Sequence, residues 1–258
     1  MRKIHRNICL WRLTIFYCMV MIATCVYAQD INVNKQKNLY VALGSADILD
    51  TYLSPFSYNG THVAVSYENF KKNDYYDGIL SFSKVTNPAG NVNEYAGDLR
   101  WRYAKLYDIF NKGDFSVKIG PMTVLDLGVL YNERNGNNPA QGRFSLMADF
   151  SSYAQYNLRI GKRKVPIRYL IDVPMIGAAF SPNYGQSYYE IFSMKKTDHN
   201  VVFAHVGNTP SLRHRLTFDV PTSKGSISLG YMGIYDQSLY NNLRYHSYSH
   251  NFIIGFSL

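Results

Sequence analysis

The residues best suited to chemistry are histidines in the last quarter of the chain. His205, His214, His246 and His250 all fall on the apolar side of alternating patterns, and Ser211 lies close to His214. A serine hydroxyl attacks an acyl ester when an imidazole takes its proton. One hypothesis is therefore a lipid hydrolase that uses Ser211 with His205 or His214. The pattern favours the alternative, a belt of histidine and tyrosine at a membrane interface, with His246 and His250 in its outer part.

Neither a metal nor a cofactor is indicated. His246 and His250 have a metal-ligand spacing for a helix, but on a strand four residues span about 13 Å. Asp47 and Asp50 fit turn-forming aspartates better than calcium ligands. The chain has no GxSxG, no P-loop and no GxGxxG after a strand. We therefore expect no metal and no cofactor, and we favour a non-enzymatic function.

A second candidate group consists of charged residues on the polar side of the alternating patterns. The nine basic members are Arg100, Arg102, Lys118, Arg143, Arg159, Arg168, Arg213, Arg215 and Arg244, and the six acidic members are Glu68, Asp98, Asp126, Asp149, Asp172 and Asp219. If they line a lumen, the basic surplus predicts a narrow channel or ligand-binding pore that favours small anions. The alternative is that these charges pair with one another and fill the interior.

A third candidate is the first long connection, Asp50 to Gly60, which Tyr52, Pro55, Phe56 and Tyr58 make aromatic and stiff. We expect an extracellular loop that either folds over the mouth of a barrel to contact a ligand or packs locally against its rim. The pattern favours local packing.

Strict alternation of apolar and polar residues runs through the chain and predicts strands. We expect about twelve, or ten at the lower count, because some patterns are weak. The expected strands are 39–48, 61–70, 77–86, 94–108, 115–131, 142–160, 165–178, 186–194, 199–206, 211–221, 225–236 and 243–258.

The lengths of the strands and of their connections distinguish a membrane barrel from a soluble periplasmic barrel or sandwich. Several expected strands exceed the usual five or six residues and suit a tilted crossing of 9–11. The connections at 71–76, 111–114, 161–164, 195–198 and 222–224 are short and contain lysine, whereas 51–60, 87–93 and 132–141 are longer. Short inner turns and longer outer loops are typical of outer-membrane barrels. We therefore predict a single antiparallel transmembrane β-barrel that closes on itself.

The last strand supports this prediction. Phe252, Ile254, Phe256 and Leu258 alternate up to the final residue. This resembles the C-terminal signature by which the barrel-assembly machinery recognises its substrates, except that the signature usually ends in Phe. We expect this machinery as one partner, and outer-membrane lipid and lipopolysaccharide as others.

The first 28 residues have the pattern of a cleaved signal peptide: a basic start, an apolar run and a small-residue cleavage site ending at Ala28. We expect a signal peptide at 1–28 and the barrel at 29–258, in the outer membrane of a Gram-negative bacterium. All three cysteines lie before Ala28, so the mature chain forms no disulfide. A lipoprotein acylated at Cys25 is the alternative, which Thr24 disfavours.

The composition agrees with an exported barrel. Of 258 residues, 47% are hydrophobic, 15% aromatic and only 17% charged, against about 25% charged in a typical soluble domain. The aromatic content excludes a disordered chain. The net charge of +9 falls to a mild +5 once the four basic residues of the expected signal peptide are removed. The longest basic run of the mature chain is Lys162-Arg163-Lys164, so we expect no nucleic-acid partner.

Three blocks resemble an uncharacterised family of Bacteroidetes outer-membrane proteins. They are the segment from Leu49 to Pro55 (LDTYLSP), the segment from Val206 to Pro221, and the NNLRYHSYSH block from Asn241 to His250. The resemblance covers most of the mature chain. It implies a barrel and its location, but it transfers no catalytic residue.

Overall fold

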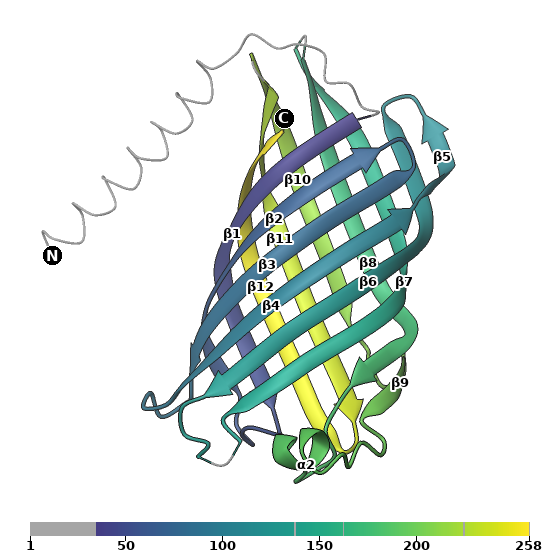
Figure 1. Cartoon of the computed structure of the whole chain (residues 1–258). Helices are drawn as coiled ribbons and strands as arrows, with labels where there is room; N and C mark the ends of the chain where they lie inside the picture. Colours follow the sequence, from purple (N-terminus) through teal and green to yellow (C-terminus); the bar gives the residue numbers. More distant parts are fainter. Residues whose placement is uncertain (1–34, 137, 162, 224, 258) are drawn as a thin grey trace, which may run out of the picture.

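The computed structural model describes residues 35–136, 138–161, 163–223 and 225–257 (Figure 1). The expected signal peptide with its three cysteines and the final Leu258 lie outside the described residues. Twelve strands and one short helix are present in the described part. They are β1 Lys35–Asp50, β2 Tyr58–Lys71, β3 Asp74–Thr86, β4 Asn93–Lys105, β5 Tyr107–Lys112, β6 Phe115–Asn132, β7 Ala140–Ile160, β8 Arg163–Phe180, α2 Tyr188–Phe192, β9 Val201–His205, β10 Leu212–Thr222, β11 Gly225–Tyr240 and β12 Leu243–Ser257.

Ten strands close into an antiparallel barrel. The ring runs β1-β2-β3-β4-β6-β7-β8-β10-β11-β12, and β12 pairs back with β1 from Asn38↔Ser257 to Asp50↔Tyr245. Closure pairs both edges of the sheet. The predicted all-β antiparallel barrel is thus confirmed, with the lower of the two strand counts in the ring.

The remaining two strands lie outside the ring. β5 pairs with the part of β6 next to the β4 contact, so it prolongs the β4–β6 ribbon beyond the rim. β9 pairs with β8 at Ile176–Phe180, on the side where β10 pairs with Ile167–Asp172. β9 and β10 therefore share one edge of β8.

Between β8 and β9 two predictions are wrong. The expected strand 186–194 contains the helix α2 instead, because Ser187 caps the helix. The Ser187 hydroxyl accepts the Glu190 backbone N–H, and the Glu190 carboxylate accepts the Ser187 backbone N–H. The expected short turn 195–198 belongs to the same long excursion between β8 and β9, not to a hairpin.

The connections sort by length onto the two ends of the barrel (Figure 1). We call the end with tight hairpin turns and both described chain ends the turn end, and the opposite end, which carries α2, the loop end. At the turn end, Lys72 and Gly113 have positive φ values of 57° and 64°, as tight turns require. The loop end also has one tight turn, where Asn241 and Asn242 have φ values of 49° and 63°.

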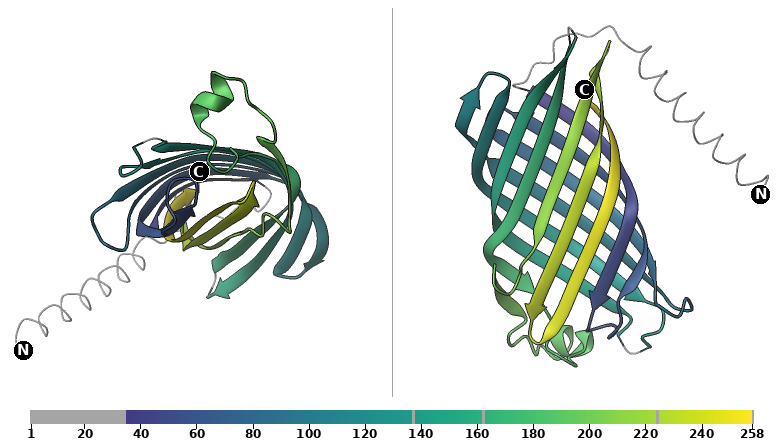
Figure 2. Two further views of the ribbon diagram at one scale, coloured as in Figure 1. Left: turned by 90° about the horizontal axis from the view of Figure 1, so that it is seen from below. Right: turned by 180° about the vertical axis from the view of Figure 1, so that it is seen from behind.

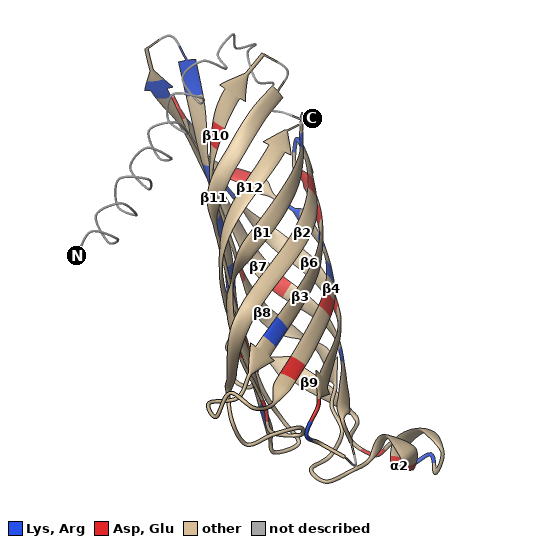
Figure 3. Cartoon of the chain, turned by 90° about the vertical axis from the view of Figure 1, so that its left-hand side faces the viewer, with Lys and Arg blue, Asp and Glu red and all other residues tan. Residues whose placement is uncertain are grey.

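The two faces of the sheet differ sharply in chemistry. Outward side chains form an apolar belt that includes Leu39, Val41, Leu43, Val63, Val65, Leu80, Phe82, Leu99, Trp101, Leu127, Val129, Phe144, Leu146, Phe150, Phe252, Ile254 and Phe256, each 40–62% exposed. Charged residues occur along the middle of the strands (Figure 3), and the buried ones point inward between apolar clusters that include Phe70 and Tyr153 on one side and Ile48 and Leu130 on the other. Among the described residues, no helix is long and apolar enough to cross a membrane.

Candidate functional site

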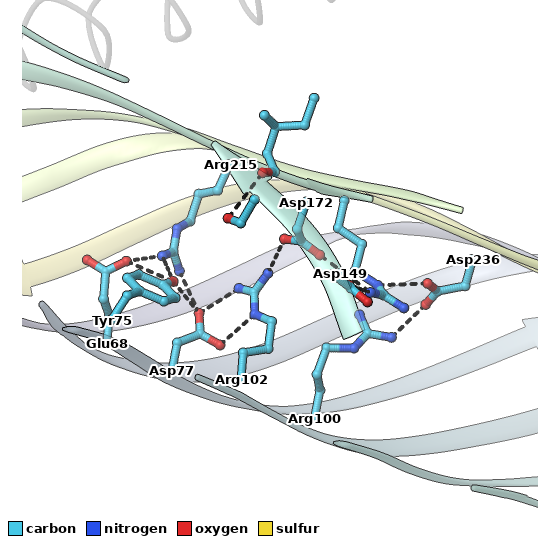
Figure 4. A network of polar contacts seen from close by, with 12 residues as sticks. Glu68, Tyr75, Asp77, Arg100, Arg102, Asp149, Asp172, Arg215 and Asp236 are labelled. Atoms are coloured by element: carbon cyan, nitrogen blue, oxygen red, sulfur yellow. Dashed lines mark hydrogen bonds and ion pairs between the residues drawn. The ribbon is translucent and has the colours of Figure 1, made fainter. Parts of the chain in front are cut away.

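Arg102 on β4 sits at the centre of a charged network inside the barrel (Figure 4). Its Nε and Nη2 donate to the two oxygens of Asp77 on β3 at 2.9 and 2.6 Å, and its Nη1 donates to Asp172 on β8 at 2.7 Å. The forked guanidinium matches the planar carboxylate in a bidentate pair. All three side chains are at most 5% exposed.

Two further arginines lie toward the turn end. Arg168 on β8 donates from Nη1 to Glu68 on β2 at 3.0 Å and from Nη2 to Asp219 on β10 at 2.8 Å. Arg215 on β10 bonds to Glu68 and to the hydroxyl of Tyr75, the latter at 2.7 Å. One glutamate therefore accepts from two guanidinium groups, which stabilise its charge.

The third group lies toward the loop end. Arg213 on β10 donates to Asp149 on β7 and Asp236 on β11, both at 2.9 Å. Arg100 on β4 reaches the same Asp236 at 2.7 Å and also bonds to Asp126 on β6. Asp236 thus joins two guanidinium groups that come from opposite sides of the ring.

The network bridges the lumen rather than lining it. In the ring of ten strands, β2 and β8 are five places apart, and so are β4 and β11. The Arg168–Glu68 and Arg100–Asp236 pairs therefore each join diametrically opposite walls by direct contact. Of the two interpretations of these charges, the geometry favours mutual pairing.

The basic surplus expected from the sequence is wrong. The Arg159 side chain is 66% exposed and pairs with Asp114 at the turn end, and Arg244 is exposed on the outside, because it shares its strand side with His246. Lys118 lies toward the turn end and bonds to Asp108. Six arginines in the described interior then face ten carboxylates, namely Asp50, Glu68, Asp77, Glu94, Asp98, Asp126, Asp149, Asp172, Asp219 and Asp236.

The sequence analysis missed Asp77 and Asp236. Both stood at the very ends of expected strands, 77–86 and 225–236, where the side of the strand is poorly defined. The strands in the structure extend to Asp74 and Tyr240, so both residues lie within a strand, and both point into the interior. Longer strand boundaries would have revealed them.

Cavities occupy the two ends of the lumen. A cavity of about 70 Å³ at the loop end is lined by Asp50, Asp98 and Arg143, and the Arg143 guanidinium carbon lies 3.0 Å from the centre of the Tyr245 ring. Another cavity of about 180 Å³, at the turn end, is lined by Lys118 and Tyr153 among others. Arg100, Arg213 and Asp236 of the charged network also line the first cavity. Smaller cavities of about 10 and 30 Å³ lie within the network beside Arg102 and Arg100.

The first loop packs against neighbouring segments of the loop end. The Asp50 carboxylate accepts the Tyr52 backbone N–H at 3.0 Å, the arrangement of a turn-forming aspartate. The Tyr52 hydroxyl donates to the Gln186 carbonyl at 2.9 Å, and Tyr58 is buried inside the loop end. Pro55 and Phe56 are exposed at the tip.

The structure does not bring Ser211 together with a histidine. The Ser211 hydroxyl is buried, donates to the Gln237 carbonyl at 3.1 Å and accepts the Gln237 N–H at 2.8 Å. His214 lies on the outer face with its ring against Tyr231 and Tyr235, and His205 accepts the Gly207 N–H. Ser211 therefore serves as a backbone partner of β11, and the Ser–His contact that the less favoured hydrolase hypothesis requires is not formed.

His246 and His250 do lie on the outer face. His250 Nδ1 is 2.6 Å from the Tyr231 hydroxyl, within a group of aromatic side chains. His246 Nε2 contacts Asp47 at 2.9 Å and Ser57 at 3.3 Å, and Ser57 also donates to Asp47. Asp47 and Ser57 meet the same ring nitrogen, whereas a proton relay needs them on different ones. The sequence analysis missed this cluster, which only the β1–β12 closure assembles.

The chain belongs to the family described as "Protein of unknown function (DUF3316)", which matches residues 11–257. None of the curated proteins matches the chain.

Three solved structures illustrate the fold likeness. Neisserial surface protein A is 9% identical with a TM-score of 0.34, over 86% of this chain and 97% of that one. The β-domain of the Bordetella autotransporter BrkA is 8% identical with a TM-score of 0.35, over 87% and 98%. A bacterial polysaccharide outer-membrane secretin is 10% identical with a TM-score of 0.35, over 89% and 100%. The fold assignment itself rests on the strand pairing.

Proposed function

We propose that this protein is an integral outer-membrane β-barrel whose lumen is sealed by its charged network, so that it serves as a non-conducting structural barrel. The proposal includes export by the signal peptide, residence in a Gram-negative outer membrane, and loops that face the cell exterior. Its partners are outer-membrane lipid and lipopolysaccharide, and the barrel-assembly machinery through the last strand. The Bacteroidetes origin is part of the same proposal and rests on the sequence resemblance.

The outward belt supports a membrane location over a soluble barrel. Large apolar side chains such as Val41, Leu43 and Leu80 are 57–62% exposed on one continuous outer face. Each Å² of apolar surface left in water costs about 25 cal/mol, and soluble monomers rarely expose such patches beyond a few hundred Å². Lipid removes this cost, and the closed ring satisfies the backbone groups that lipid cannot.

The observation that carries the sealed lumen is the pairing of walls five strands apart. Arg168–Glu68 at 3.0 Å and Arg100–Asp236 at 2.7 Å leave no room between the paired groups for a hydrated ion. Small barrels of about eight strands are likewise filled by side chains, whereas sixteen or more strands leave a water channel.

Conductance of purified protein in planar bilayers tests this proposal. We expect insertion without steady conductance, together with heat-modifiable gel migration that reports the folded barrel. Stable open-channel steps from folded protein would contradict the sealed lumen. A water-soluble product that is not heat-modifiable would contradict the membrane barrel.

A further inference from the structure

The excursion between β8 and β9 carries an exposed apolar surface away from the barrel. We call residues 183–196 the α2 segment; it projects sideways at the loop end (Figures 2 and 3). Tyr189 and Phe192, three positions apart on α2, are 69% and 70% exposed, and Met194 is 50% exposed. Side chains of this kind grouped on one projecting segment indicate a surface that contacts something apolar.

The α2 segment is held in place by specific bonds. The Tyr188 hydroxyl accepts the Gly142 N–H at 2.6 Å and lies 2.9 Å from the Gln141 side chain at the start of β7. Gln186 accepts from Tyr52 through its carbonyl and from Asn200 through its side chain, the latter at 2.7 Å. The apolar side chains therefore occupy a fixed position relative to the barrel wall.

Aromatic contacts connect this segment with the outer face. The Phe180 ring at the end of β8 lies 6.3 Å from the Tyr188 ring, and Tyr188 stacks on Phe192 at 5.9 Å and 13°. On β9, Val201 and Phe203 are also exposed. The apolar surface of the barrel thus continues onto the α2 segment.

Two lysines follow the apolar side chains directly. Lys195 is exposed, and Lys196 lies 3.8 Å from Glu190 with its side chain 58% exposed. Aromatic and aliphatic side chains next to lysines are typical of segments that lie in the headgroup region of a bilayer, where the ammonium groups reach phosphates. A water-facing protein partner would not require continuity with the belt.

We propose that the α2 segment is an interfacial foot, which inserts Phe192, Tyr189 and Met194 into the headgroup layer around the loop end of the barrel. This inference rests on the proposed membrane location. The partner is the lipid surface of the same membrane, recognised by apolar contact and by lysine–phosphate attraction.

Tryptophan fluorescence in vesicles tests the foot. Trp101 lies in the apolar belt, and Trp11, in the expected signal peptide, is the other tryptophan of the chain. All variants carry Trp11→Phe, and the variant with this change alone reports from Trp101. Phe192→Trp and Tyr189→Trp, each combined with Trp101→Phe, report from the foot, and Ala89→Trp in the same background reports from an exposed loop tip.

The vesicles contain phosphatidylcholine brominated near the headgroup, and heat-modifiable migration confirms that each version is folded. We expect Trp101 and both foot reporters to lose about half of their emission, and the Ala89→Trp reporter to lose little.

The two proposals fail in different ways. Quenching of Trp101 with foot reporters that behave like Ala89→Trp would overturn the foot and leave the membrane barrel standing. Absence of quenching at Trp101 as well would overturn the membrane location. The foot reporters could instead be shielded from water but not quenched by bromine, with a shielding that increases with protein concentration. That result would assign the surface to a second protein copy and overturn the lipid partner.

Discussion

Arg168 on β8 and Glu68 on β2 meet across the lumen, toward the turn end, at 3.0 Å, although their strands lie five places apart in a ring of ten. Both side chains are 4% exposed. Taking two charges out of water is costly, and their attraction offsets this only when further hydrogen bonds satisfy them. Gln36, Tyr40, Asn38 and Asp219 provide these bonds. The pair therefore joins two opposite walls of the barrel at this level.

Replacing one partner of this pair should be strongly destabilising. Arg168→Met leaves Glu68 and Asp219 short of donors inside the barrel, and we expect the free energy of unfolding to fall by about 3–5 kcal/mol. Urea unfolding in detergent, followed by gel mobility, measures the loss. Arg159→Met, which breaks the exposed pair with Asp114, should leave the midpoint unchanged. Equal effects of the two variants would contradict a stabilising network.

An artificially opened lumen should prefer cations. Carboxylates outnumber arginines in the described interior, and Arg213→Ser with Arg215→Ser increases the difference. Reversal potentials of the folded double variant in planar bilayers measure the selectivity. The preference should weaken above about 0.15 M salt, where the screening length is about 8 Å. Anion preference would show that the count of interior charges is wrong.

Gly44 should be essential for closing the ring. A Cβ at this position on β1 would lie 1.8 Å from the His250 carbonyl oxygen on β12. We expect Gly44→Ala to cost about 1–3 kcal/mol, because the closing strands must separate. Gly78→Ala is the matched control, since a Cβ there meets nothing within 4 Å. The fraction of heat-modifiable protein after refolding compares the two, and normal refolding of Gly44→Ala would refute the close approach.

Ser211 should contribute to stability and not to catalysis. Ser211→Ala removes both bonds to the Gln237 backbone, and we expect a loss of about 1–3 kcal/mol. Fatty-acid release from lipid vesicles should be the same for wild type, Ser211→Ala and His214→Ala. Release by the wild type that either folded variant abolishes would restore the hydrolase hypothesis.

The position of α2 should depend on pH through Glu190. Bonds from the Ser187 backbone and hydroxyl, together with Lys196, lower the pKa of the Glu190 carboxyl below its ordinary value of 4.5. A lowered pKa means that the cap contributes above pH 4.5 and is lost as the pH falls through the lowered value. The emission of the Phe192→Trp reporter should therefore change on acidification. Glu190→Gln should remove that change, and a persistent change would assign it to another group.

The alternation of apolar and polar residues was enough to predict the barrel and most of its two faces. Phe144, Leu146 and Phe150 lie outside and Arg143 and Asp149 inside, as their alternating order requires. This is local information, because successive side chains of a strand point to opposite sides. It fails where a strand end is misjudged, as at Asp77, or where an irregular segment replaces a strand, as at α2.

The sequence by itself therefore determined the class of fold, and its polar pattern included the six arginines of the interior, together with Arg159 and Arg244, which lie elsewhere. Only the tertiary structure decided that ten strands close the ring and that β2 faces β8 across it. The same closure places Asp47 and Ser57 beside His246. These relationships depend on how many strands complete the circle. That number sets which side chains meet across the lumen, and no local spacing in the chain contains it.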